Sequence, residues 1–142
     1  MDKDTKLHSV LNITAATAIE TIQIAFVEAK KIGINISVAV VDTSLSLVAF
    51  SRGDGATPHS AETSRRKANT AASTGKVTGW MSSDLAVTLP MASGNLLTNV
   101  PGGVPLRFNG VLGGGLGIAG GTVEQDSAIA KSALVAIGAD TL

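Results

Sequence analysis

Residues 101–126 constrain the fold more than any other part of this chain. The segment reads PGGVPLRFNGVLGGGLGIAGGTVEQD, which predicts a strand, a tight turn, a glycine-rich strand and the start of a helix. Asn109-Gly110 between two apolar runs is typical of a two-residue hairpin, so the two strands should be antiparallel. Thr122 and Gln125 have the spacing of a capping box, which places the start of the last helix directly after Thr122.

The same segment contains the pattern G-x-G-x-x-G at Gly115, Gly117 and Gly120. This pattern marks dinucleotide sites only within a βαβ unit, where another strand follows the helix. Here the predicted helix runs almost to Leu142 and no strand can follow. We therefore expect no NAD or FAD, and we interpret the glycines as positions where backbones approach closely.

The remaining sequence predicts helices and hairpins from apolar spacing and capping residues. One helix should begin after Asn12 or Thr14 and end at Lys31, another should be capped by Thr57 with Pro58 as its first residue, and a short one should follow Ser82 or Ser83 and stop before Pro90. Taken together, the predicted elements are helices over 15–31, 58–74, 83–89 and 123–137, and strands over 36–42, 47–51, 104–108 and 111–119, with irregular chain over 91–100. No lone crossover helix separates two strands, which indicates an α+β fold with helices packed on an antiparallel sheet.

Composition narrows the class of protein. A chain of 142 residues, 44% of them hydrophobic, is expected to form one domain over 1–142, with polar residues 1–12 as a flexible arm. Eleven basic residues balance eleven acidic ones and aromatic residues are only 3%, which argues against nucleic acid as a partner. There is no cysteine, so disulfides and thiolate metal sites are excluded.

The stretch between Leu85 and Val123 carries only one charge, Arg107. Prolines and glycines interrupt it, so we predict buried sheet and subunit contacts and not a membrane span. Its uncharged character favours a homo-oligomer. The polar start of the chain lacks the apolar core of a signal peptide, which favours the cytoplasm.

Two histidines, His8 and His59, are candidate ligands for haem iron or another metal. The predicted helix start at His59 favours neutral imidazole, which is the form that binds metal. His8 lies on the arm, from where it can fold over a pocket or a neighbouring subunit. Either histidine can equally be a solvated surface residue. No ligand spacing of the H-E-x-x-H kind occurs, so no intrinsic zinc is expected.

Three further groups are candidate ligand-binding residues. Arg52 in a glycine-rich turn can hold a carboxylate, although Asp54 can equally be its structural partner. Lys67 follows two arginines on a predicted helix. It also belongs to a KA-x-TA core that resembles the family named below, and this resemblance implies that its stem packs inward with its amine at a pocket or interface. The last group consists of glycines that enter and leave the second hairpin: Gly102, Gly103, Gly120 and Gly121. Backbone N–H groups there can bind an anion or can simply be satisfied by the helix cap.

Several of these segments resemble the GlcG/HbpS family, also called DUF336 or haem-degrading. The resemblance rests on GGVPLRFNG with GGGLGIAGGTVEQD, on SVAVVDTSLSLVAFSRGDGA and on ETSRRKANTAAS, and it covers roughly residues 12–138. The C-terminal part is also similar to the C-terminal domain of PduO-type corrinoid adenosyltransferases. The resemblance implies a profilin-like, three-layer α/β/α fold with a five-stranded antiparallel sheet, and oligomers from dimers up to octamers.

The resemblance also implies a small-molecule ligand, which would be haem or a related tetrapyrrole or corrinoid. It suggests an accessory role in cobalamin-dependent diol or glycerol metabolism. Two alternatives remain open: an enzyme acting on a small carboxylic acid or aldehyde, with Arg52 or Lys67 as the anion anchor, and a ligand-free accessory subunit of a larger enzyme. The residues themselves define no catalytic set, because no spacing pairs the carboxylates and no serine lies in G-x-S-x-G.

Overall fold

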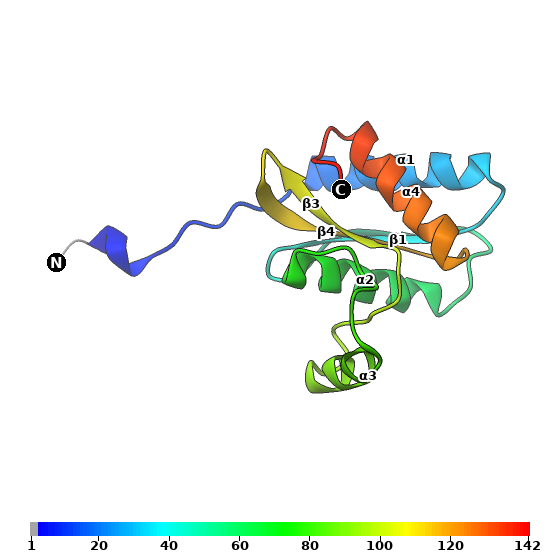
Figure 1. The fold of residues 1–142 in the computed structure, drawn as a ribbon. Coiled ribbons are helices and arrows are strands. Elements are labelled where there is room, and N and C mark those ends of the chain that lie inside the picture. Colours follow the sequence, from blue (N-terminus) through cyan, green and yellow to red (C-terminus); the bar gives the residue numbers. More distant parts are fainter. Residues whose placement is uncertain (1–2) are drawn as a thin grey trace.

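The computed structural model describes residues 3–142. Its elements are η1 (Lys3–Lys6), α1 (Ala15–Lys31), β1 (Ser37–Asp42), β2 (Leu47–Arg52), α2 (Ser60–Thr74), α3 (Ser83–Ala92), β3 (Gly103–Phe108), β4 (Val111–Ala119) and α4 (Val123–Ala136). They form three layers, with α1 and α4 on one face of the sheet and α2 on the other (Figure 1). The expected α+β class with a three-layer arrangement is confirmed.

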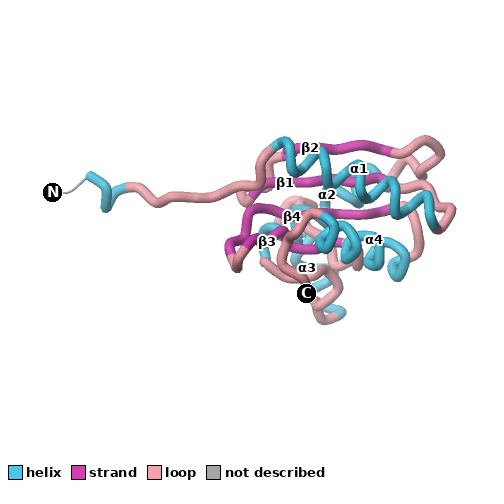
Figure 2. The backbone as a smooth tube through the Cα atoms, turned by 90° about the horizontal axis from the view of Figure 1, so that it is seen from above, coloured by secondary structure: helices cyan, strands magenta, loops and turns pink. Residues whose placement is uncertain are grey.

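The sheet has four strands in the order β2-β1-β4-β3, and all neighbours are antiparallel (Figure 2). The expectation of five strands was therefore wrong. The outer edge of β3 is occupied by single hydrogen bonds from loops, because the Thr78 N–H donates to the Gly103 carbonyl and the Asp140 N–H donates to the Arg107 carbonyl. These contacts leave no continuous edge to which a fifth strand could pair.

The two faces of the sheet differ in side-chain size. Toward α1 and α4 the strands present large aliphatic residues, and these form the main core: Val38, Val40, Val104, Leu106, Leu116 and Ile118. Toward α2 they present small ones, because Gly115 and Gly117 of β4 face its backbone. An added Cβ at Gly115 would lie 2.8 Å from the Ala72 nitrogen. The glycine pattern therefore serves close packing of α2 on β4.

The second hairpin and the start of the last helix lie where the sequence predicts them. Asn109 and Gly110 both have positive φ, at 53° and 79°, as the predicted tight turn requires. The Thr122 hydroxyl accepts from the Gln125 N–H and the Gln125 side chain accepts from the Thr122 N–H, so the capping box is confirmed.

Two predicted helix ends were wrong. α2 begins at Ser60 with His59 as its N-cap residue, because the Ser60 N–H and hydroxyl both bond to the Thr57 carbonyl in a preceding turn. α3 begins after Ser82 as expected, but it continues through Pro90 to Ala92. Proline lacks the N–H that would bond to the Ala86 carbonyl, but no residue of α3 is buried, so water can satisfy that carbonyl.

Helix α3 lies in the α3 connection, the largely apolar residues 75–102 that link α2 to β3. This connection projects from the α2 side of the molecule (Figure 1). None of the residues of α3 is buried, and Val87 and Met91 are 63% and 73% exposed. Two hydrogen bonds attach the α3 connection to α2. The Asn69 side chain donates to the Leu96 carbonyl, and the Thr98 N–H donates to the Thr70 hydroxyl.

Residues 3–12 are all exposed, and the N-terminal segment runs away from the body of the molecule (Figure 1). The Asn12 side chain accepts hydrogen bonds from the backbone N–H and hydroxyl of Thr43, which fixes the base of the segment at the β1–β2 turn. Residues 1–2 of the predicted arm lie outside the described residues. Within residues 3–142 no helix is both long and apolar enough to cross a membrane.

Candidate functional site

A cleft of about 230 Å³ lies where the starts of α2 and α4 meet the end of β4. Its lining residues come from these elements and from the loop before β3: Thr57, His59, Ser60, Thr63, Lys67, Val100, Ala119, Gly120, Gly121, Val123 and Asp126. A hydrogen bond of 2.8 Å between the hydroxyls of Ser37 and Ser60 ties the start of α2 to the start of β1. The sheet end and two helix ends therefore hold the cleft rigidly.

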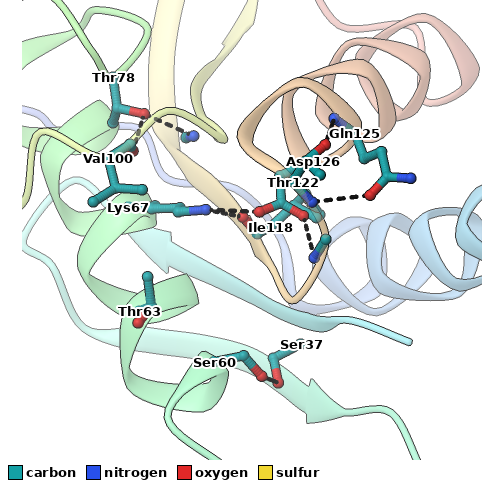
Figure 3. Close-up of polar contacts among 12 residues, drawn as sticks. Ser37, Ser60, Thr63, Lys67, Thr78, Val100, Ile118, Thr122, Gln125 and Asp126 are labelled. Atoms are coloured by element: carbon teal, nitrogen blue, oxygen red, sulfur yellow. Dashed lines mark hydrogen bonds and ion pairs between the residues drawn. The ribbon is translucent and has the colours of Figure 1, made fainter. Parts of the chain in front are cut away.

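Lys67 and Asp126 form a buried ion pair in the wall of this cleft (Figure 3). The Lys67 amine donates to Asp126 Oδ2 at 3.0 Å and to the Ile118 carbonyl at 2.7 Å. The other carboxylate oxygen, Asp126 Oδ1, accepts from the Gly121 N–H at 2.9 Å. Because α2 and α4 lie on opposite faces of the sheet, the pair joins the two helical layers around the end of β4.

Glycine makes room for this pair. A Cβ at Gly102 would lie 2.8 Å from the Lys67 amine and 3.0 Å from Asp126 Cβ, and Gly102 has a φ of 123°. A Cβ at Gly103 would meet the Lys67 carbonyl. The glycines that enter the second hairpin therefore admit the lysine side chain to the sheet end.

Burial lowers the pKa of the Lys67 amine, although Asp126 opposes this by favouring the ammonium form. The unfolded chain, in which a lysine titrates near 10.5, consequently binds more protons than the folded chain just below that pH.

This difference predicts a pH dependence of stability. As pH rises toward about 10.5, the free energy of unfolding of the wild type should increase relative to that of Lys67→Met. The reason is that stability rises with pH where the unfolded state binds more protons than the folded state. Urea titrations of both proteins at a series of pH values above neutrality measure the gain. Parallel pH curves for the two proteins would contradict the effect of burial on Lys67.

The structure brings five of the predicted ligand-binding residues together. His59, Lys67, Gly120 and Gly121 line the cleft, and Gly102 lies against the Lys67 amine. The inward stem of Lys67 and its amine at a pocket are as expected from the sequence. The imidazole of His59 is exposed and makes no hydrogen bond with any described residue, so it is free to bind a ligand.

The other candidates lie elsewhere. Arg52 and Asp54 are exposed and form no ion pair with each other, and Asp54 lines a separate hollow beside Lys30. His8 lies on the N-terminal segment, whose base is at the β1–β2 turn, whereas His59 lies near the start of β1. A six-residue strand of about 17–20 Å separates these ends, so one chain does not bring both histidines to one iron atom.

Two features of the site were missed from the sequence. The partner of Lys67 is Asp126, which is 59 residues away, and no local pattern signals such a pair. An apolar strip formed by Val100, Pro101 and Val123 borders the cleft and continues into a second hollow that Lys131 lines. Residues 3–142 contain no group of three metal-ligating side chains.

The fold is that of a known family of small α+β proteins. The family model for haem-degrading, HbpS-like proteins matches residues 13–135, and the chain belongs to this family. It is 33% identical over 136 residues to an uncharacterized 15.0 kDa protein from the dhaT-dhaS intergenic region of Citrobacter freundii, a match that covers 91% of this chain and 94% of the relative.

Two solved structures share the whole architecture. The crystal structure of Klebsiella pneumoniae protein ORFY superposes with a TM-score of 0.86 at 27% identity, over 97% of both chains. The structure of a PduOC–haem complex superposes with a TM-score of 0.84 at 28% identity, over 92% of this chain and 99% of the other. The resemblance to the PduO C-terminal domain is therefore confirmed in three dimensions.

Proposed function

We propose that this protein binds haem, or a related tetrapyrrole or corrinoid, at the cleft between the starts of α2 and α4. The observation that carries the proposal is the unbonded imidazole of His59 on the rim of this cleft, in a family with a haem complex among its structures. A neutral imidazole is a common axial ligand of haem iron.

The residues around the cleft fit a haem group in three respects. His59 would hold the iron through its imidazole, the apolar strip of Val100, Pro101 and Val123 would contact the macrocycle, and the exposed Lys131 would pair with a propionate. Val100 and Val123 are 40% and 38% exposed, so they are available to a flat ligand. When bound, haem would supply iron that can coordinate a further ligand or exchange electrons.

The cleft of about 230 Å³ is smaller than a tetrapyrrole, so the apolar strip would have to hold the rest of the ligand. A second subunit would then be needed to cover the exposed face. This supports an oligomeric binding protein, which we place in the cytoplasm as an accessory to cobalamin-dependent diol or glycerol metabolism, alone or with a larger enzyme.

Addition of haemin to the purified protein is expected to give a saturable shift of the Soret band. His59→Ala should abolish the shift or weaken binding at least tenfold, because iron loses its axial nitrogen. His8→Ala is the matched control and should bind like the wild type. Equal binding by His59→Ala and the wild type would remove His59 as the ligand, and no Soret shift with the wild type would remove haem binding altogether.

The exposed apolar side chains of the α3 connection lead us to expect that the protein self-associates. Exposed Val87 and Met91 lie on a helix whose only charge is Asp84, and large apolar patches are rare on monomers. Light scattering at micromolar concentration should give a mass well above the 14.3 kDa of one chain. Met91→Glu should lower that mass, whereas Glu124→Gln, at an exposed position of α4, should not. A wild-type mass of one chain would rule out the oligomer.

A further inference from the structure

Lys67 has no role in the proposed binding of haem, and its surroundings are unusual for a lysine. It and Asp126 are the only charged residues buried in the part of the chain that the structure describes, and Lys67 is 1% exposed. Lysine is rarely buried to this degree. A buried ion pair is weak evidence for stability, because apolar residues of similar shape commonly do as well. The fold alone therefore gives no strong reason for an amine at this place.

The Lys67 nitrogen has two hydrogen-bond acceptors, Asp126 Oδ2 and the Ile118 carbonyl. Its fourth tetrahedral position has no partner among the described residues. This position holds the third N–H of the ammonium in the ion pair and becomes the lone pair once a proton passes to Asp126. Lys67 and Asp126 both line the cleft, so a small molecule bound there would lie beside the pair.

We propose that Lys67 is a carbonyl-reactive lysine that forms an imine with a small aldehyde bound in the cleft. The proposal does not rest on haem binding. The cleft of about 230 Å³ has room for an aldehyde of a few carbons. Its wall offers hydroxyls from Thr57 and Thr63 but no arginine, so it suits an uncharged carbonyl compound better than a carboxylate.

Asp126 provides the proton transfers that such a reaction needs. The ammonium of Lys67 passes one proton to the carboxylate, and the amine nitrogen then bonds to the carbonyl carbon while the C=O electron pair moves to oxygen. That oxygen takes one of the two protons left on nitrogen and one from Asp126, and it leaves as water when the C=N bond forms. The nitrogen keeps one proton, so the sum is lysine ammonium plus aldehyde giving protonated imine plus water, with Asp126 again a carboxylate and with no oxidant or reductant. Burial of Lys67 supports the reaction because it favours the neutral amine.

Reductive trapping tests the proposal on the wild-type protein. The native protein is treated with acetaldehyde and cyanoborohydride near neutral pH, and the alkylated lysines are located by peptide mass mapping. Lys67 should be ethylated to a greater extent than the exposed lysines, which serve as internal references: Lys30, Lys31, Lys76 and Lys131. In urea the preference for Lys67 should disappear, because it depends on the folded cleft.

Lys67→Arg keeps the positive charge and should show no preferred site of ethylation. Native protein in which Lys67 is labelled less than the exposed lysines would overturn the proposal. The haemin titration is read separately by absorbance. Loss of haem binding with preserved Lys67 labelling, or the reverse, therefore distinguishes failure of one proposal from failure of the other.

Discussion

Replacing Gly115 by valine or alanine is expected to destabilise the fold severely. The added Cβ would meet the Ala68 carbonyl and lie 2.8 Å from the Ala72 nitrogen, and these are backbone atoms of α2 that cannot rotate away. Overpacking usually costs about 1–3 kcal/mol, and displacement of a whole helix should put this variant at about 3 kcal/mol or above. Urea titration of each variant measures the loss.

Gly94→Ala is the matched control for Gly115→Ala. Nothing lies within 4 Å of a Cβ at Gly94, where φ is 67°. Its cost should therefore be only the left-handed backbone penalty of about 1–2 kcal/mol. A Gly115→Ala protein as stable as Gly94→Ala would show that α2 does not pack as closely on β4 as described.

Lys67→Met should be comparably destabilising for a different reason. The substitution leaves the Asp126 carboxylate buried without its counterion, and breaking a buried pair from one side typically costs about 3–5 kcal/mol. The double variant Lys67→Met/Asp126→Asn removes both charges while an oxygen remains to accept from the Gly121 N–H. It should be more stable than Lys67→Met alone. Losses that simply add would contradict a coupled buried pair.

Local sequence patterns predicted most of the fold. Asn109-Gly110 fixed the second hairpin, and Thr122 with Gln125 fixed the start of α4, because both patterns satisfy their hydrogen bonds within a few residues. The glycine-rich strand predicted over 111–119 is β4, which lies between β1 and β3. Patterns of this kind depend on short-range geometry, so they can be interpreted without knowledge of the rest of the chain.

The features that were predicted wrongly or not at all depend on long-range contacts. A fifth strand was implied by family resemblance alone, and the edge of β3 is instead covered by Thr78 and Asp140 from distant parts of the chain. The same limit applies to the site. The inward stem of Lys67 was predicted, but its pairing with Asp126 across the end of the sheet arises only when α2 and α4 pack on opposite faces.

Hydrogen–deuterium exchange with and without haemin tests most directly the claim that the cleft is the haem site. Bound haem should slow exchange in peptides that contain 57–63 and 119–125, because these residues form the cleft and its rim. Peptides over 8–13 and 43–46, at the opposite end of β1, should be unchanged. Protection confined to those distant peptides, or to 83–92, would contradict a haem site at the starts of α2 and α4.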